Sequence, residues 1–390
     1  MLKEFLEDQN AKNKLKKSLY KLIHKKGITS KIDFLNEINV PQTTLTRMVS
    51  ELEERGLIRS RGYGESSGGR PPVLYEVVPD TGYVIGIEIS RTHVSITLLN
   101  IMFDVLGQIR FTLTKDHTPK ITIEKIIHKI NALLEEHSIK IDLLLGIGVG
   151  AVGPLDREKG IILNPEGFLA DGWENVQIVS MLQSEFSVPI FLNNGANTAA
   201  LAEYEIQGLE EEDILYCISG FGIRCGFISK GAFLNLREGD TSSYGHIIIE
   251  PNGRKCICGR KGCLNAYVSF DAIFKAIEET NISPPLKINM IDELLGLLNN
   301  DYILKKLLES AYYYGIAIAN MVNILHPTTV VLHGKLIYQS NEYYNEVIRV
   351  AKEHIYSTKR NQIMIKKGSL GEDSTAIGAA MHAFLSLFKN

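Results

Sequence analysis

The first 56 residues place apolar side chains at helical spacing. In residues 13–26 one face carries leucine and isoleucine and the other carries lysine, and Gly27 ends the pattern. Ser30 is suited to cap a second, short helix, with Asp33 three residues later. A third helix begins at or just after Pro41, ends at Gly56, and has a core stripe of Leu45, Met48, Val49 and Leu52.

Two short helices joined by a tight turn predict a helix-turn-helix, and the strand–turn–strand pattern of residues 57–78 predicts a wing. Gly69 and Arg70 at the wing tip would approach a DNA backbone and add positive charge there. The polar side chains at the start of the third helix would enter a major groove: Gln42, Thr43, Thr44, Thr46 and Arg47. A small helical bundle used for dimerisation is the alternative.

From residue 80 onward, short β-branched strands alternate with helices. This alternation predicts an α/β architecture, with one group of strands in residues 80–195 and a second in residues 196–375. We expect two lobes with a cleft between them, where a ligand would meet the strand ends. The helical patterns predict long helices at 266–281 and 288–325.

Charge divides the chain near the same point. Residues 1–75 hold 14 Lys and Arg against 9 Asp and Glu, a net charge of +5, whereas the whole chain carries −3. This favours nucleic acid as the partner of one end only, and a solvated basic helix is the alternative. Without a long apolar run or a signal-peptide core, we expect a cytoplasmic protein, associated with the nucleoid when bound to DNA.

Three cysteines and a histidine lie close together in one polar, glycine-rich segment. His246, Cys256, Cys258 and Cys263 form the pattern H-x9-C-x-C-x4-C, which supplies four protein ligands for a tetrahedral Zn²⁺. Four protein ligands leave no open coordination position, so the predicted zinc is structural. Buried cysteines that pack as small hydrophobic residues are the alternative.

The loop CICGRKGC, preceded by Gly-His, resembles the ROK family of bacterial repressors and sugar kinases. The segments GPLD (153–156), NNGANTAALAEY (193–204), NILHPTTVVLHG (323–334) and GEDSTAIGAA (371–380) also match, so the resemblance covers nearly the whole chain. The wing ending in GGRPP is similar to the DNA-binding half of the family's repressors, of which the xylose-repressor-like regulators are one type.

The resemblance implies a winged helix-turn-helix joined to a two-lobed, actin-like and sugar-kinase-like body of the ribonuclease H type. We expect a DNA-binding domain at 1–78 and a first α/β lobe at 79–195, against which residues 376–390 pack. We expect the second lobe, with the zinc loop and an oligomerisation surface, at 196–375.

The chain departs from the kinase pattern at positions that carry the chemistry. The Asp of the kinases' Asn-Asp-Ala-Asn, their general base, is Gly195 here. Loss of a positioned base costs roughly 10²–10⁴ in rate. The glycines of their Asp-x-Gly-Gly-Thr phosphate loop are replaced by Ser90 and Arg91. In the second phosphate loop Gly220, Gly222 and Gly226 remain and should shape the turn, while Arg224 and Cys225 should fill the nucleotide space.

The sugar contacts that the resemblance implies also differ. Two carboxylates of the family's pattern are replaced by Ser243 and Asn265, which bind hydroxyl groups less strongly. The expected effector is a small sugar or a sugar derivative, and a pocket that binds nothing is the alternative. Its expected contacts are Asn194, Gly167, Ser243, His246 and Asn265.

These features predict a sugar-responsive repressor, without enzymatic activity, that binds a palindromic operator as a homodimer or homotetramer. An ATP-dependent sugar kinase with a regulatory DNA-binding domain is the rival, and it needs another base, such as Asp171 or Asp240. A body that binds a protein in place of a sugar is a third possibility.

Overall fold

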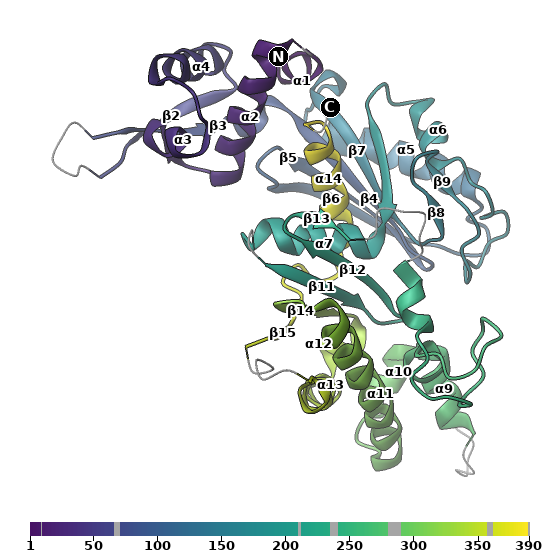
Figure 1. Ribbon diagram of the computed structural model, residues 1–390. Helices are drawn as coiled ribbons and strands as arrows, with labels where there is room; N and C mark the ends of the chain where they lie inside the picture. Colours follow the sequence, from purple (N-terminus) through teal and green to yellow (C-terminus); the bar gives the residue numbers. More distant parts are fainter. Residues whose placement is uncertain are drawn as a thin grey trace.

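A small helical unit at the N-terminus sits on one end of a two-lobed body in the computed structural model (Figure 1). The structure describes residues 1–8, 10–65, 71–209, 212–234, 241–279, 290–356 and 362–388. Gly69, Arg70 and Asp240 therefore lie outside the described residues. Within those residues, no helix has both the length and the apolar character needed to cross a bilayer.

The N-terminal unit has the order of a winged helix. The capping box predicted for its second helix is present, since Asp33 Oδ2 accepts from the Ser30 amide at 2.9 Å and Ser30 Oγ accepts from the Asp33 amide at 3.5 Å. The sequence pattern did not predict the short helix at Leu2–Glu7. The elements are α1 (Leu2–Glu7), α2 (Ala11–Lys26), β1 (Thr29–Ser30), α3 (Lys31–Glu37), α4 (Gln42–Glu54), β2 (Ile58–Tyr63) and β3 (Val73–Val77).

The first lobe is built on a five-stranded sheet in the order β10-β7-β4-β5-β6. β4, β5 and β6 form an antiparallel meander, whereas β7 pairs in parallel with β4 and β10 pairs in parallel with β7. The strands are β4 (Tyr83–Ile89), β5 (His93–Asn100), β6 (Val105–Thr112), β7 (Leu144–Ala151) and β10 (Ile190–Asn194). The remaining elements are η1 (Pro79–Thr81), α5 (Pro119–Glu136), η2 (Ile141–Leu143), β8 (Leu155–Asp156), β9 (Ile161–Ile162) and α6 (Ile178–Gln183).

The second lobe repeats this plan, with the strand order β13-β12-β11-β14-β15. Its strands are β11 (Asp213–Ile218), β12 (Arg224–Ser229), β13 (Ala232–Phe233), β14 (Thr329–His333) and β15 (Met364–Lys367). Its helices are η3 (Thr241–His246), α8 (Asn265–Val268), α9 (Phe270–Glu278), α10 (Ile291–Gly296), α11 (Asp301–Leu325), α12 (Lys335–Gln339) and α13 (Asn341–His354). Two lobes with the same sheet plan confirm the predicted fold class; the domain boundaries given above stay predictions.

The long helix expected at 288–325 is wrong in one respect. It is interrupted after Gly296, and α11 begins anew at Asp301, because the Asn300 side chain accepts from the amides of Tyr302 and Ile303. An asparagine that bonds to the next turn's amides starts a helix and does not continue one. Apolar residues recur at helical spacing on both sides of this break, so the periodicity alone does not show it.

Two helices lie between the lobes. These are α7 (Gly195–Ile206), which follows directly from β10, and α14 (Ser374–Ser386), which follows η4 (Gly371–Asp373). In Figure 1 the yellow α14 runs from the level of the second lobe up to the winged helix. A Cβ at Gly86, Gly148 or Gly378 would lie 1.7–1.8 Å from a backbone oxygen of α14 or α7, so glycine permits this close approach.

Candidate metal, effector and DNA sites

The four predicted metal ligands come together in the second lobe. The ligand atoms of His246, Cys256, Cys258 and Cys263 all lie within 4.8 Å of one another. Cys256 Sγ is 3.6 Å from His246 Nδ1, and Cys258 Sγ is 3.6 Å from Cys263 Sγ. A tetrahedron with metal–sulfur bonds of about 2.3 Å has edges of roughly 3.8 Å. The donor set therefore fits a tetrahedral ion such as Zn²⁺.

The loop that carries the cysteines depends on two glycines in the left-handed region. Gly259 has φ +84° and Gly262 has φ +77°. A Cβ at Gly262 would lie 2.0 Å from the Glu250 carbonyl oxygen, so no other residue fits there. The Cys256 amide donates to the Arg260 carbonyl and closes the turn. Burial acts to raise the pKa of the Cys258 thiol, but hydrogen bonds with Arg260 and with the thiols of Cys256 and Cys263 outweigh burial and lower this pKa to about 6. A thiolate is the form that binds a metal.

At the position of the family's general base stands a glycine, and a side chain there would come close to one neighbour. Gly195 begins α7, and a Cβ built there would lie 3.1 Å from Cγ2 of Thr375. Thr375 comes from the first turn of α14 and is buried. Asp171, one of the two replacements considered above, is exposed in a loop of the first lobe. Nothing in the sequence pattern signalled Thr375, because only folding brings residue 375 to residue 195.

The turn between β4 and β5, where the kinases hold phosphate, is filled with side-chain hydrogen bonds. Ser90 Oγ lies 2.8 Å from Nδ1 of His93, and it accepts from the amides of Thr92 and His93. His93 Nε2 lies 3.4 Å from the buried carboxylate of Glu88 and 3.0 Å from Arg110. These side chains occupy the turn where an open phosphate loop would expose backbone amides.

Side chains from both lobes act on Glu88. Burial acts to raise its pKa, but the hydrogen bond with His93 and the positive charge of Arg224 outweigh burial, so the pKa lies below its usual value. Burial lowers the pKa of His333, at the end of β14, to about 4. A carboxylate and an arginine thus share this region with a neutral histidine.

The expectation for the second phosphate loop is half wrong. Cys225 does not face the nucleotide space: it is buried in the second-lobe core, with Sγ 3.3 Å from Cys217 Sγ and 3.8 Å from Met321 Sδ. Arg224, its neighbour on β12, points to the other side of the sheet, as the alternation of a strand requires. Gly226 lies in β12 and not in the turn, and a Cβ there would meet the Ala196 carbonyl oxygen at 2.3 Å.

The five predicted effector contacts divide between the lobes. Asn194 is buried at the start of α7, and Gly167, with φ +84°, lies in a loop where the Arg91 Nε donates to the Glu166 carbonyl at 2.6 Å. The other three contacts are in the second lobe. Ser243 and His246 belong to η3, and Asn265 is the first residue of α8. Asn265 Oδ1 accepts from the Ile223 amide at 2.8 Å, so this side chain holds the second glycine loop in place.

The predicted DNA-reading residues lie on one face at the start of α4. Gln42, Thr43, Thr46 and Arg47 are exposed and Thr44 is half-buried, whereas the core stripe predicted from the sequence is buried. The Arg47 side chain is 70% exposed and forms a 3.7 Å ion pair with Glu51. An exposed polar face of this kind is available to a groove.

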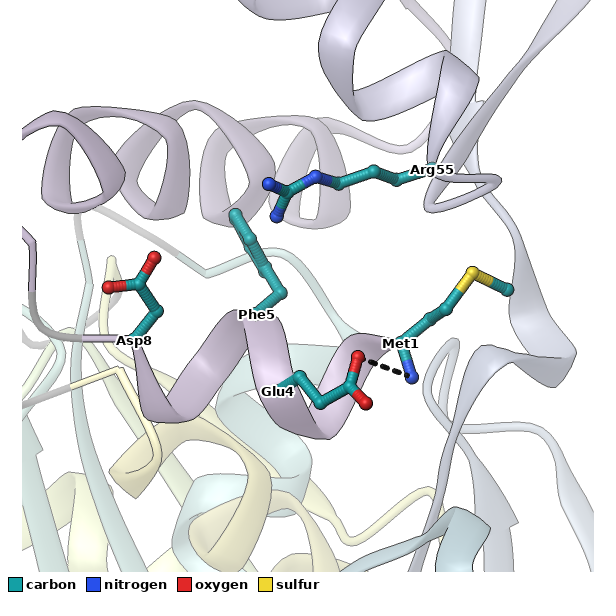
Figure 2. Close-up of a pocket in the computed structure, with 5 residues that line it drawn as sticks. All are labelled: Met1, Glu4, Phe5, Asp8 and Arg55. Atoms are coloured by element: carbon teal, nitrogen blue, oxygen red, sulfur yellow. Dashed lines mark ion pairs between the residues drawn. The ribbon is translucent and has the colours of Figure 1, made fainter.

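A further hollow occurs within the winged helix, away from these residues. Figure 2 shows it between α1 and the end of α4. Its volume is about 310 Å³, and it is lined by Met1, Glu4, Phe5, Asp8 and Arg55. The Met1 amino group pairs with Glu4 at 3.5 Å. None of the residues predicted to bind metal, effector or DNA lines it.

The fold and the cysteine loop define a winged helix joined to a two-lobed body of the sugar-kinase type. The family model for the ROK family matches residues 84–384, and the chain belongs to this family. It is 27% identical over 368 residues to the xylose repressor of Bacillus subtilis, covering 93% of this chain and 92% of that protein. It is 25% identical to the N-acetylglucosamine repressor of Escherichia coli O6:H1, covering 82% and 80%.

Two solved structures are similar to different lengths of this chain. A ROK hexokinase from Thermus thermophilus matches 79% of this chain and 100% of its own, with TM-score 0.67 and 26% identity. A ROK family transcriptional regulator, homologous to the Mlc protein of Escherichia coli, matches 97% of both chains, with TM-score 0.77 and 21% identity. The whole chain, winged helix included, therefore has the fold of that regulator.

Proposed function

We propose that this protein is a sugar-responsive transcriptional repressor that binds a palindromic operator through its winged helix. The observation that carries the proposal is the pairing of an exposed polar face on α4 with a kinase-type body that has a glycine, Gly195, at the base position. The full-length relatives named as xylose and N-acetylglucosamine repressors support the same function.

The DNA-reading surface comprises Gln42, Thr43, Thr44, Thr46 and Arg47, together with Gly69 and Arg70 of the wing. Short polar side chains reach base edges, and the arginines contribute phosphate or minor-groove contacts. Two copies are needed to read a palindrome, so the active form is a homodimer or a homotetramer.

The effector site lies in the body, with Asn194 and Gly167 on the first lobe and Ser243, His246 and Asn265 on the second. The ligand is a neutral, polar sugar or a derivative, since amide and hydroxyl groups replace the family's carboxylates. D-xylose is the first candidate, because the full-length relatives include xylose repressors. By linkage, an effector that prefers one lobe arrangement changes operator affinity by the same coupling free energy.

A Zn²⁺ ion held by His246, Cys256, Cys258 and Cys263 is structural in this proposal. When bound, it cross-links a loop that has few apolar residues of its own. His246 ends η3, which also carries Ser243, so the ion orders one wall of the effector site.

The test is binding of purified protein to DNA fragments from upstream of its own gene, followed by fluorescence anisotropy with and without D-xylose, N-acetyl-D-glucosamine and D-glucose. We expect nanomolar binding to one fragment and a change of about tenfold with one sugar. Binding that is equal for all fragments and insensitive to every sugar contradicts the proposal.

The likeness to the Thermus thermophilus hexokinase makes an ATP-dependent sugar kinase the second candidate. A coupled assay of ADP release with the same sugars separates the two. The repressor proposal expects no turnover above background, because neither the base nor the phosphate-loop glycines are present. Sugar-dependent ADP release well above that background favours the kinase.

A further inference from the structure

The winged helix and the cleft are connected by one buried path through α14. A single hydrophobic cluster includes Leu45 and Val49 of α4, Tyr20 of α2, Phe384 of α14 and Tyr216 of the second-lobe sheet. A linker that allowed the winged helix to move freely would instead separate two cores. The position of the winged helix is therefore determined by packing and not only by chain connection.

The upper end of α14 forms an aromatic box around a histidine of α2, named here the His24 box. The ring of His24 lies 4.7 Å from that of Phe384 and 5.0 Å from that of Phe103, and its Nε2 donates to the Ile101 carbonyl. Phe388 extends the contact by stacking on Tyr20, with centroids 6.1 Å apart. Burial lowers the pKa of His24 to about 4, so the imidazole is neutral and packs as an aromatic ring.

The box is held by a strained turn. Phe103 has φ +67°, a left-handed conformation that a bulky aromatic side chain rarely adopts. The Asn100 side chain stabilises this turn by accepting from the amides of Met102 and Asp104 at 2.9 and 3.1 Å. Strain of this kind persists where surrounding contacts require it, and here it places the Phe103 ring against both His24 and Phe384.

The lower end of α14 contacts both lobes near the start of α7. Glu372, just before the helix, pairs with Arg110 at 2.6 Å, and Arg110 contacts His93 in the former phosphate turn. Ser374 Oγ is 3.0 Å from the Tyr216 hydroxyl group in the second-lobe sheet. Thr375 packs against Gly195 at the start of α7, next to Asn194. The thirteen residues of α14 span about 20 Å between these contacts and the His24 box.

We propose that α14 and the His24 box form a rigid coupling element that transmits lobe movement at the cleft to the DNA-reading helix. The glycine contacts at Gly86, Gly148 and Gly378 leave α14 no free space, so it moves with the sheet and with α7 as a unit. A small shift at the cleft end is carried to α2, and α2 packs on α4 in the winged helix. The regulatory role rests on the proposed function, whereas the rigidity of the junction does not.

The junction is tested in the full-length protein by hydrogen–deuterium exchange without any ligand. His24→Ala removes the ring from the box, and His128→Ala, on the exposed face of α5, is the matched control. We expect exchange of α2 and α4 amides to rise by about tenfold in His24→Ala while β4 and β7 change by less than about twofold. His24→Phe keeps an aromatic ring in the box and should remain close to wild type.

Three results would contradict the proposal that the His24 box holds the winged helix rigidly on the body. These are exchange indistinguishable from that of His128→Ala, an increase confined to the last turn of α2, or an equal increase throughout the body. The last would show that His24 supports global stability only.

The regulatory role is tested by operator affinity with D-xylose. In wild type we expect a change of about tenfold, and in His24→Ala less than about twofold, while D-xylose raises the melting temperature of both proteins. A full D-xylose response in His24→Ala overturns the role of the box. If D-xylose leaves the wild-type affinity unchanged, the proposed effector fails, and the exchange measurement still decides whether the junction is rigid.

Discussion

The metal loop of the second lobe keeps all four candidate ligands of the ROK sequence pattern, whereas the start of α7 keeps both asparagines of its pattern but has Gly195 in place of the Asp. In the loop, four ligand atoms converge within 4.8 Å, and two glycines take the left-handed conformations that the turn requires. At the start of α7 the chain keeps Asn194 and Asn197 around Gly195, which offers no proton acceptor, and a Cβ there would lie 3.1 Å from Cγ2 of Thr375.

The difference separates a ligand set that the sequence keeps whole from a base position that it does not keep. A structural metal site contributes to folding, so each of its ligands bears on stability. A general base contributes only to a transition state, and without a reaction its side chain has no function to preserve.

The largest effect is expected in the metal loop. Cys258→Ser removes one of four ligands, so we expect the metal content to fall from about one ion per chain to near zero. The second lobe should lose roughly 5 kcal/mol of stability. Mass spectrometry of metals and urea unfolding measure the two. Cys225→Ala is the control, since Cys225 is buried in the same lobe outside the cluster, and it should retain the metal. Wild-type protein that carries no metal when purified without chelator contradicts the site.

The second prediction concerns the pH dependence of stability outside the metal loop, through a buried histidine at the end of β14. The folded-state pKa of His333 is about 4, below its unfolded value of 6.5, because of burial. The unfolded chain therefore takes up the proton first. The stability that the neutral ring contributes is present above pH 6.5 and is lost as the pH falls towards 4, by about 2 kcal/mol between pH 7 and pH 5. The stability that the neutral ring of His24 contributes should fall by a similar amount over the same pH range, because burial lowers its pKa to about 4 as well.

Urea unfolding of wild type and His333→Phe at pH 7 and pH 5 measures this loss. The variant should show a difference between the two pH values that is smaller by about 2 kcal/mol than in wild type. An identical pH dependence in both proteins shows that His333 titrates normally.

A base restored at Gly195 separates lost chemistry from lost space. Gly195→Asp should cost about 2 kcal/mol, because its Cβ would meet the Thr375 methyl group at 3.1 Å. In Gly195→Asp with Thr375→Ala, part of this loss should be recovered. Neither variant should release ADP, since Ser90 and Arg91 still replace the phosphate-loop glycines. Urea unfolding and the coupled assay measure both outcomes, and sugar-dependent turnover in the double variant would show that one residue had silenced the enzyme.

The smallest effect is expected outside both regions. Arg47→Ala should weaken operator binding by about 1 kcal/mol, while metal content and body stability stay unchanged. Lys120→Ala, which removes an exposed positive charge from α5 of the first lobe, is the control and should leave operator affinity unchanged. Anisotropy titrations at several salt concentrations test this, since loss of a phosphate contact lowers the salt slope by about one. Unchanged affinity together with an unchanged slope shows that the recognition face lies elsewhere.

Local patterns predicted most of the fold because they depend on neighbours in sequence. The Ser30–Asp33 capping box, the core stripe of α4 and the hairpin of β4 and β5 each follow from residues a few positions apart. The break between α10 and α11 was missed, because a capping asparagine inside a continuous apolar periodicity is a weak signal against it. The metal ligands were predictable for the same reason: their spacing is local, and few other roles gather three cysteines in eight residues.

The sequence by itself therefore determined the helices and the hairpin of the N-terminal unit, the alternation that forms two lobes, the spacing of the four candidate metal ligands and the glycine at position 195. Only the tertiary structure decided which side chains meet across long separations: Thr375 over Gly195, Arg110 with Glu372, and His24 within a box formed by Phe103 and Phe384. It also decided that Cys225 faces the core and not the cleft. The physical reason is that burial, close contact and charge pairing depend on packing between elements, and no local periodicity in the chain records which elements pack together.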